Sequence, residues 1–170
     1  AEMLSLQKDI FYVWGINPKK QAEKIRYLPS PHLSKIKDSY AKKNDHILFI
    51  SGFIPRFRFR CSTALQPEDG PKYLKDQILF LDSLDENIKK RIWYRTHHNQ
   101  IESRMNFIGQ CYPNMNFLFK GKLIKWMQKA NMVIIDHLAT SILEVLTINV
   151  PCIFYWDHDV YLIREEAEEY

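Results

Sequence analysis

Cysteine is scarce in this chain of 170 residues, and its three copies, Cys61, Cys111 and Cys152, form no CxxC pair. Their odd number and wide spacing argue against a disulfide framework or a zinc ribbon. A chain with so few cysteines suits a reducing compartment. We therefore expect a cytoplasmic protein.

Long hydrophobic runs are also missing. No apolar stretch of the sequence approaches the roughly 20 residues that span a bilayer, and the first residues lack the basic start and apolar core of a signal peptide. The chain begins with Ala-Glu, and Arg164–Tyr170 has the pattern of the middle of a helix. These features predict a fragment cut from a larger polypeptide that is not secreted.

Glycine is rare, with 5 copies, whereas 14% of the residues are aromatic, which argues against low complexity and disorder. The hydrophobic fraction of 46% and the charged fraction of 26% are ordinary for a globular domain. A net charge of +4 suits an anionic ligand but falls short of a nucleic-acid-binding signature. We expect no nucleic-acid partner.

The most informative segment is Ala130–Asp157, which has the pattern strand, loop, helix and second strand. Met132–Ile135 is an apolar run of strand length, and the loop after it leads into Thr140-Ser141, whose side chains are typical helix caps. Val150-Pro151 ends the helix before a strand that starts at Cys152. A helix that begins there directs free N–H groups and the positive end of its dipole at the loop, which is typical of an anion-binding βαβ unit.

The rest of the chain also alternates between strand-like and helix-like segments. This order predicts an α/β, Rossmann-like fold with a parallel sheet and helices on both faces, over residues 45–170, preceded by a linker or connecting segment over residues 1–44. The region around Met105–Ile108 has no clear pattern. The expected strands are Phe11–Ile16, His46–Ile50, Arg91–Thr96 and Asn116–Phe119, the expected helices are Tyr73–Asp82, Leu123–Lys129 and a candidate at Lys19–Arg26, and Leu28–Pro31 is expected to be extended.

Ligands of such folds bind beyond the carboxyl ends of the strands. The loops that follow the expected strands should therefore bring their polar residues to one rim of the sheet. The residues placed there are Ser51, Gly52, Arg56, Arg95, His97, Asp136, Thr140 and Asp157.

Several short motifs occur in an order that resembles the nucleotide-binding C-terminal half of a GT-B-type transferase. They are Tyr12–Gly15, Tyr27–Pro31, Pro55–Arg60, Ile92–Arg95, and Ala139–Glu144 followed by Asn149–Pro151. The resemblance is to the transferases that build bacterial cell-surface polysaccharides, and the last motif is also similar to the CDP-glycerol glycerophosphotransferases. After the arginine strand, this chain departs from the family pattern with Thr96-His97-His98-Asn99.

The resemblance implies a transferase whose donor is a nucleotide-activated sugar or polyol phosphate, with no further cofactor. Thr140 and Ser141 would hold the diphosphate, and Glu144 would accept from the ribose hydroxyls. Arg95 and one of two loop arginines would neutralise the leaving diphosphate. The complete predicted substrate-binding set is Ser51, Gly52, Arg56, Arg58, Arg95, His97, Asp136, His137, Thr140, Ser141, Glu144 and Asp157, with no metal ligand and no assigned catalytic residue.

The expected partners are the nucleoside diphosphate donor and a missing N-terminal domain that binds the acceptor. Because a complete GT-B enzyme needs two domains, the isolated chain should bind a donor without turning it over. The longer enzyme could associate peripherally with a membrane. The alternative is a non-catalytic binding module of the same fold, whose aromatic surface contacts a protein.

Several motifs keep a second interpretation. Thr140-Ser141 could be caps alone, and Glu144 and Arg95 could be solvated charges. Arg56–Arg60, with arginine and phenylalanine alternating, fits an edge strand or a single-stranded nucleic-acid binder as well as a phosphate contact. His137 could be a general base that Asp136 orients.

Two motifs could bind a metal. His97-His98 are adjacent and lack the spaced partners of a metal site. Asp157-His158-Asp159 resembles the DxD motif of another glycosyltransferase architecture. Its place after a parallel strand favours the ligand rim instead.

Overall fold

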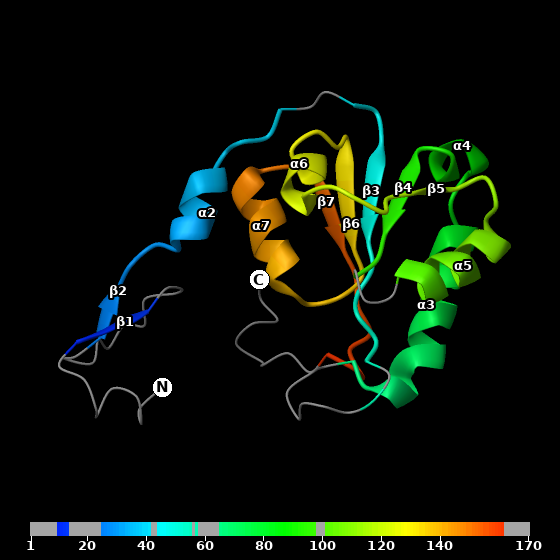
Figure 1. Cartoon of the computed structure of the whole chain (residues 1–170), viewed down its shortest axis with the longest axis horizontal. Coiled ribbons are helices and arrows are strands. Elements are labelled where there is room, and N and C mark those ends of the chain that lie inside the picture. Colours follow the sequence, from blue (N-terminus) through cyan, green and yellow to red (C-terminus); the bar gives the residue numbers. More distant parts are fainter. Residues whose placement is uncertain are drawn as a thin grey trace.

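A computed structural model describes residues 10–13, 25–41, 44–55, 57, 65–97 and 101–161, except the side chains of Phe11 and of residues 101–103. Its centre is a five-stranded sheet of order β5-β4-β3-β6-β7 in which every pair is parallel (Figure 1). The fold is therefore the predicted Rossmann-like α/β arrangement. The strands are β3 (Ile47–Ile50), β4 (Ile92–Arg95), β5 (Asn116–Phe117), β6 (Met132–Ile135) and β7 (Cys152–Phe154).

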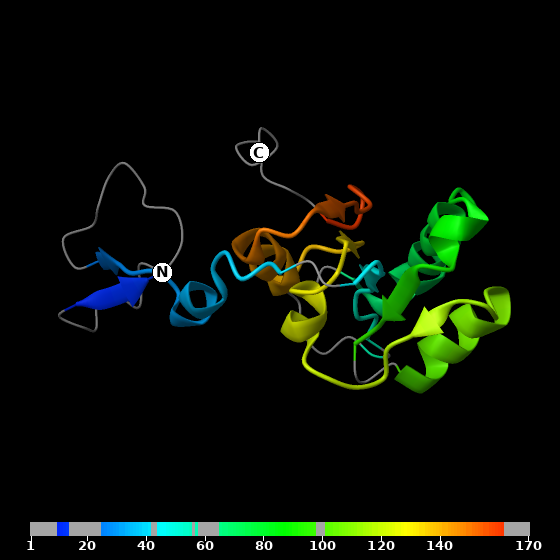
Figure 2. The same cartoon turned by 90° about the horizontal axis from the view of Figure 1, so that it is seen from above.

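Helices cover both faces of this sheet, as Figures 1 and 2 show. One face carries α3 (Gly70–Asp82) and α5 (Ile101–Cys111), and the other carries α6 (Leu123–Met127), α7 (Thr140–Ile148) and α2 (Pro31–Ile36). Two short helical segments, η1 (Pro67–Asp69) and α4 (Glu86–Lys89), precede and follow α3.

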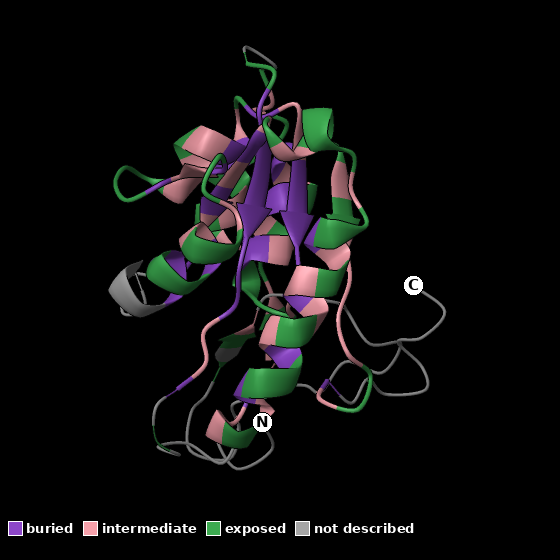
Figure 3. Ribbon diagram, turned by 90° about the vertical axis from the view of Figure 1, so that its right-hand side faces the viewer, coloured by how far each residue is buried: buried purple, intermediate pink, exposed green. Residues whose placement is uncertain are grey.

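The central strands are buried on both faces, and Figure 3 shows them in the core. Successive side chains of a strand point to opposite faces. Leu48 and Ile50 of β3 accordingly pack in the cluster with Val145 of α7, whereas Phe49 packs with Leu81 of α3. The almost wholly apolar sequence of β3 follows from this double burial.

The N-terminal segment holds a small separate sheet. Strands β1 (Phe11–Val13) and β2 (Ile25–Tyr27) pair in parallel, away from the central sheet (Figure 2). Next along the chain, α2 and the turn after it lie on α7, where the amide of Asp38 donates to the carbonyl oxygen of Thr147 at 2.9 Å. The proposed boundary at residue 45 stays a prediction.

Two expectations about local structure were wrong. Pro31 is not extended but begins α2, and Ser30 before it takes the extended conformation and caps the helix, because the residue before proline avoids helical angles. Ile25 and Arg26 belong to β2 and not to a helix. The region around Met105–Ile108, for which the sequence predicted no element, belongs to the helix α5.

A third correction concerns the start of α7. Thr140 and Ser141 are not its caps, because the helix begins at Thr140 and its N-cap is Ala139. Ala139 is extended, with φ −150° and ψ 174°, and has no side-chain hydrogen bond to the first turn. Asn149, in the left-handed region at φ 67°, ends the helix before Val150-Pro151, as the sequence predicted.

Candidate functional site

A pocket of about 370 Å³ lies at the carboxyl rim of the sheet beside the start of α7. We call it the α7 pocket. Its walls come from the loops after β3, β4 and β6 and from the first turns of α7. Its lining includes seven residues of the predicted set, Ser51, Arg95, His97, His137, Thr140, Ser141 and Glu144, together with Ile50, Phe53, Thr96, Leu123 and Ala139.

The first turn of α7 faces this pocket without a side-chain cap. The amide of Ile142 donates to the carbonyl oxygen of Ala139 at 3.0 Å, and among the described residues no side chain at the N-cap position accepts from the turn. The first N–H groups of a helix have no partner within the helix and carry its positive partial charge. They are therefore suited to an anion in the pocket.

Two hydroxyl groups of the α7 pocket are buried and have no hydrogen-bond partner among the described residues. They are the Oγ of Ser141, a residue 7% exposed, and the Oγ1 of Thr96, 6% exposed. A buried polar group that lacks a partner costs about 1–3 kcal/mol. A ligand with acceptor oxygens would remove this cost.

Arg95 supplies the positive charge of the pocket from the end of β4. Its guanidinium donates to the carbonyl oxygen of Gly121 at 2.9 Å and more weakly to that of Lys120 at 3.4 Å. Gly121 has φ +95°, a conformation that glycine adopts readily. Within the described part of the chain no carboxylate pairs with Arg95, and burial lowers its pKa because it disfavours the charged form.

Glu144 lies one turn into α7 and already has a protein partner. Its Oε1 is 2.8 Å from Nε2 of His32, which α2 brings to this place. The N-terminal segment therefore contributes a side chain next to the α7 pocket. Any role of Glu144 in binding ribose would use its other oxygen or displace His32.

A cluster of buried polar side chains lies behind the α7 pocket. The side-chain nitrogen of Gln77 donates to the carboxylate of Asp136, to Ser51 Oγ at 2.7 Å and to Tyr73 OH at 3.0 Å. Arg104, 4% exposed, donates to Ser51 Oγ at 2.8 Å. Burial raises the pKa of Tyr73, so this phenol stays protonated. We call these five residues the buried wall.

Asp136 orients His137 at the edge of the wall. One oxygen of the Asp136 carboxylate accepts from the amide of Gly52 at 3.1 Å and lies 3.0 Å from Nδ1 of His137. An ionised carboxylate can only accept, so in the neutral ring that donates to it the proton is on Nδ1 and Nε2 is an acceptor. This arrangement suits a histidine that accepts a proton at Nε2.

Comparison with known proteins assigns the family. The family model described as LIC12162 family transferase matches residues 2–170. The chain belongs to the LIC12162 family of transferases. No curated protein matches the chain, and no solved structure does.

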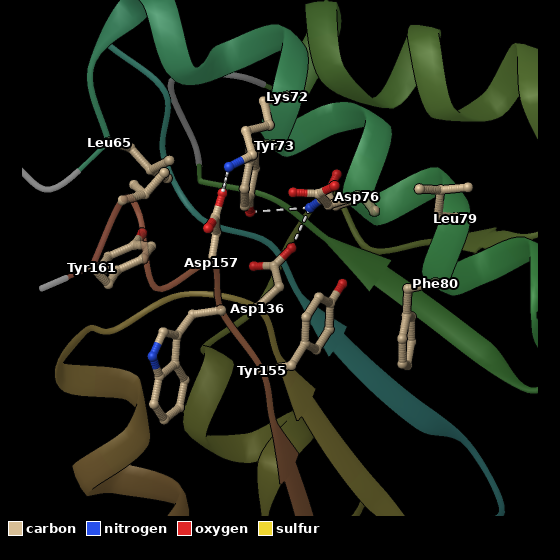
Figure 4. Close-up of a pocket in the computed structure, with 13 residues that line it drawn as sticks. Leu65, Lys72, Tyr73, Asp76, Leu79, Phe80, Asp136, Tyr155, Asp157 and Tyr161 are labelled. Carbon is tan, nitrogen blue, oxygen red and sulfur yellow. Dashed lines mark hydrogen bonds and ion pairs between the residues drawn. The ribbon is translucent and has the colours of Figure 1, made fainter. Parts of the chain in front are cut away.

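A second pocket of this LIC12162 family transferase lies on the other face of the same rim, between α3 and the segment after β7 (Figure 4). We call it the α3 pocket; its volume is about 470 Å³. Its lining includes Asp136 and Asp157 of the predicted set. Gly52 lines neither pocket, and its amide donates a hydrogen bond to Tyr73 OH at 2.6 Å. Arg56 and Arg58 lie outside the described residues.

The DxD-like motif and the histidine pair form no metal site in the described chain. Asp157 and Asp159 both pair with Lys72, at 2.5 and 3.0 Å, and the hydrogen bond from Lys72 lowers the pKa of Asp157. Among the described residues, no three His, Cys, Asp or Glu side chains gather as a metal ion would require. His98 lies outside these residues.

The described helices also include none with the length and apolar character needed to cross a bilayer.

Sequence reasoning missed Gln77, Tyr73 and Arg104. One signal for Gln77 was available, since it falls between Tyr73 and Leu81 at spacings of four residues, on the apolar face of α3. A polar residue on such a face indicates a buried partner. Arg104 gave no comparable signal, because its helix had no clear pattern.

Proposed function

We propose that this chain is the donor-binding half of a two-domain, GT-B-type transferase of bacterial surface polysaccharide synthesis. The donor is a nucleotide-activated sugar or polyol phosphate, and the α7 pocket holds its diphosphate. The observation that carries the proposal is the convergence on one pocket of an uncapped helix N-terminus, an arginine and two buried hydroxyls. Among the described residues, the arginine pairs with no carboxylate and the hydroxyls have no hydrogen-bond partner. Family membership supports the transferase class.

Charge complementarity explains why these groups suit a leaving diphosphate. In sugar transfer, an acceptor hydroxyl attacks the carbon bonded to the diphosphate, and the electron pair of the broken C–O bond stays on the departing nucleoside diphosphate. In polyol-phosphate transfer, the hydroxyl attacks the distal phosphorus of the diphosphate, and the electron pair of the broken P–O bond stays on the departing nucleoside monophosphate. Arg95 and the first amides of α7 would stabilise this added negative charge. They are held in place before the reaction, so little reorganisation is needed.

The proton of the acceptor hydroxyl needs a base. Within the α7 pocket, His137 is placed to accept it at Nε2, because the carboxylate of Asp136 fixes Nδ1 as the donor. A base from the missing acceptor domain is the competing assignment. The two are separated by whether His137→Gln lowers turnover in the full-length enzyme or only donor affinity.

Calorimetry with UDP, CDP, GDP and ADP tests donor binding by the 170-residue chain. We expect at least one to bind with a Kd of about 1 mM or tighter. Arg95→Gln removes a charged hydrogen-bond donor worth about 1.5–3 kcal/mol, so it should weaken binding by roughly tenfold to a hundredfold. Ser141→Ala should weaken it by a smaller factor.

Arg91→Gln is the matched control. Arg91 comes directly before β4, at the opposite end of the strand from Arg95, and forms an ion pair on the surface with Asp45 at 2.7 Å. It should leave nucleotide affinity unchanged. If no nucleoside diphosphate binds, or if the Arg91 and Arg95 variants behave alike, the donor-binding assignment is wrong and the non-catalytic binding module gains support.

A further inference from the structure

The α3 pocket has the composition of a second ligand site. Aromatic residues form much of its lining: Tyr155 and Trp156 follow β7, and Phe80 comes from α3. Tyr161 also lines the pocket (Figure 4). The rings of Phe80 and Tyr155 stack at 4.6 Å between centroids. Its volume of about 470 Å³ is typical of pockets that bind small molecules.

Unsatisfied polar atoms occur among these rings. The OH of Tyr155 and the indole Nε1 of Trp156 are buried, and neither has a hydrogen-bond partner in the part of the chain that the structure describes. Burial raises the pKa of Tyr155, so its OH remains a donor. The side chain of Asp76, a half-buried residue of the lining, makes no hydrogen bond or ion pair with any other described residue. The pocket thus offers two donors and one carboxylate acceptor to a ligand.

The charge of the α3 pocket is opposite in character to that of the α7 pocket. Its lysine, Lys72, is neutralised by Asp157 and Asp159. The carboxylate of Asp76 remains, whereas Asp136, on the buried wall that both pockets share, already accepts hydrogen bonds from Gln77 and Gly52. Negative charge in a partly desolvated pocket disfavours an anionic ligand.

We propose that the α3 pocket binds an uncharged ring that carries hydroxyl or amino donors, of the size of a hexose or a nucleobase. The ring would stack on the aromatic wall, donate to Asp76 and accept from Tyr155 or Trp156. Both chemistries present a flat or apolar face and a polar edge, which an aromatic pocket with a few polar groups recognises. The proposal stands whether or not the α7 pocket takes a diphosphate.

Ligand-observed NMR and calorimetry on the 170-residue chain test this site. One arm uses the nucleosides uridine, cytidine, adenosine and guanosine, and the other uses the neutral sugars glucose, galactose, mannose and N-acetylglucosamine. We expect one arm to bind in the millimolar range and pyrophosphate not to compete with it. Binding by nucleosides assigns the ring to a base, and binding by sugars assigns it to a transferred or accepting sugar.

Two conservative variants locate the binding. Trp156→Phe keeps an aromatic ring and removes the N–H, and Asp76→Asn keeps the shape and removes the charged acceptor. Each should weaken ring binding about tenfold, the loss expected for one hydrogen bond of about 1.4 kcal/mol. Arg95→Gln should leave ring binding unchanged, which separates failure here from failure at the α7 pocket.

Glu86→Gln on α4 is the matched control for Asp76→Asn, because Glu86 is an exposed carboxylate paired with Lys89 outside the α3 pocket. Thermal melts confirm that each variant folds, and Tyr155→Phe replaces any that does not. The proposal is overturned if no ligand of either arm binds with a Kd of about 10 mM or tighter. It is equally overturned if all folded α3-pocket variants bind as the parent chain does.

Discussion

Replacing Gln77 by leucine tests the buried wall, on which the shape of both pockets depends. Gln77 is fully buried, and its amide nitrogen donates to three side chains while its oxygen accepts from Tyr94 OH at 3.2 Å. Leucine has a similar volume but no polar atoms. The variant therefore keeps the packing and removes every one of these hydrogen bonds.

The expected cost follows from the groups left behind. The Asp136 carboxylate loses one of its donors, and a hydrogen bond to a charged group is worth about 1.5–3 kcal/mol. Tyr94 OH loses its acceptor, which adds about 1 kcal/mol, whereas Ser51 keeps its bond from Arg104. We expect Gln77→Leu to lower the free energy of unfolding by about 3 kcal/mol.

Urea denaturation at neutral pH measures this change. Gln110→Leu on α5 is the matched control, because Gln110 is exposed and the same substitution there should stay within about 0.5 kcal/mol. The reasoning is refuted if Gln77→Leu costs less than about 1 kcal/mol, or if the two variants cost the same.

Two further predictions concern pH and packing. His46 is buried, and desolvation lowers its pKa below 6.5, so below pH 6.5 the unfolded state binds more protons than the folded state. The free energy of unfolding should therefore fall there by up to about 1.4 kcal/mol per pH unit as the pH drops. Urea denaturation at several pH values should show a smaller dependence on pH for His46→Phe, and an identical dependence would contradict this. Leu81 is fully buried, whereas Leu79 is 57% exposed. In urea denaturation, Leu81→Ala should lower the free energy of unfolding by about 2–5 kcal/mol and Leu79→Ala by less than about 1 kcal/mol. Equal losses would refute the assigned core.

Much of the sheet could be predicted because its strands are short apolar runs bounded by turn signals. Ile47–Ile50 and Met132–Ile135 are such runs, and both are central parallel strands. The α7 unit could be predicted for the same reason, except for its first residue. Thr140 and Ser141 have the side chains of caps, but the backbone angles of Ala139 place the helix start there, and the sequence does not show those angles.

The division of the predicted rim into two pockets could not be read from the chain. Asp136 and His137 are adjacent, yet Asp136 lines the α3 pocket and His137 the α7 pocket. The buried wall joins residues 53 positions apart, Ser51 and Arg104, and no local pattern marks such a contact. Partnering of this kind depends on tertiary packing, so the sequence supplied candidates for the site but not their grouping.

The central claim is that the first amides of α7 receive a diphosphate. Backbone amide NMR during titration with the best-binding nucleoside diphosphate tests it directly. We expect the largest shifts to fall on Thr140, Ser141 and Ile142 and to be much smaller in the Arg95→Gln variant at the same, subsaturating ligand concentration. Shifts confined to other elements, with the start of α7 unchanged, would contradict it.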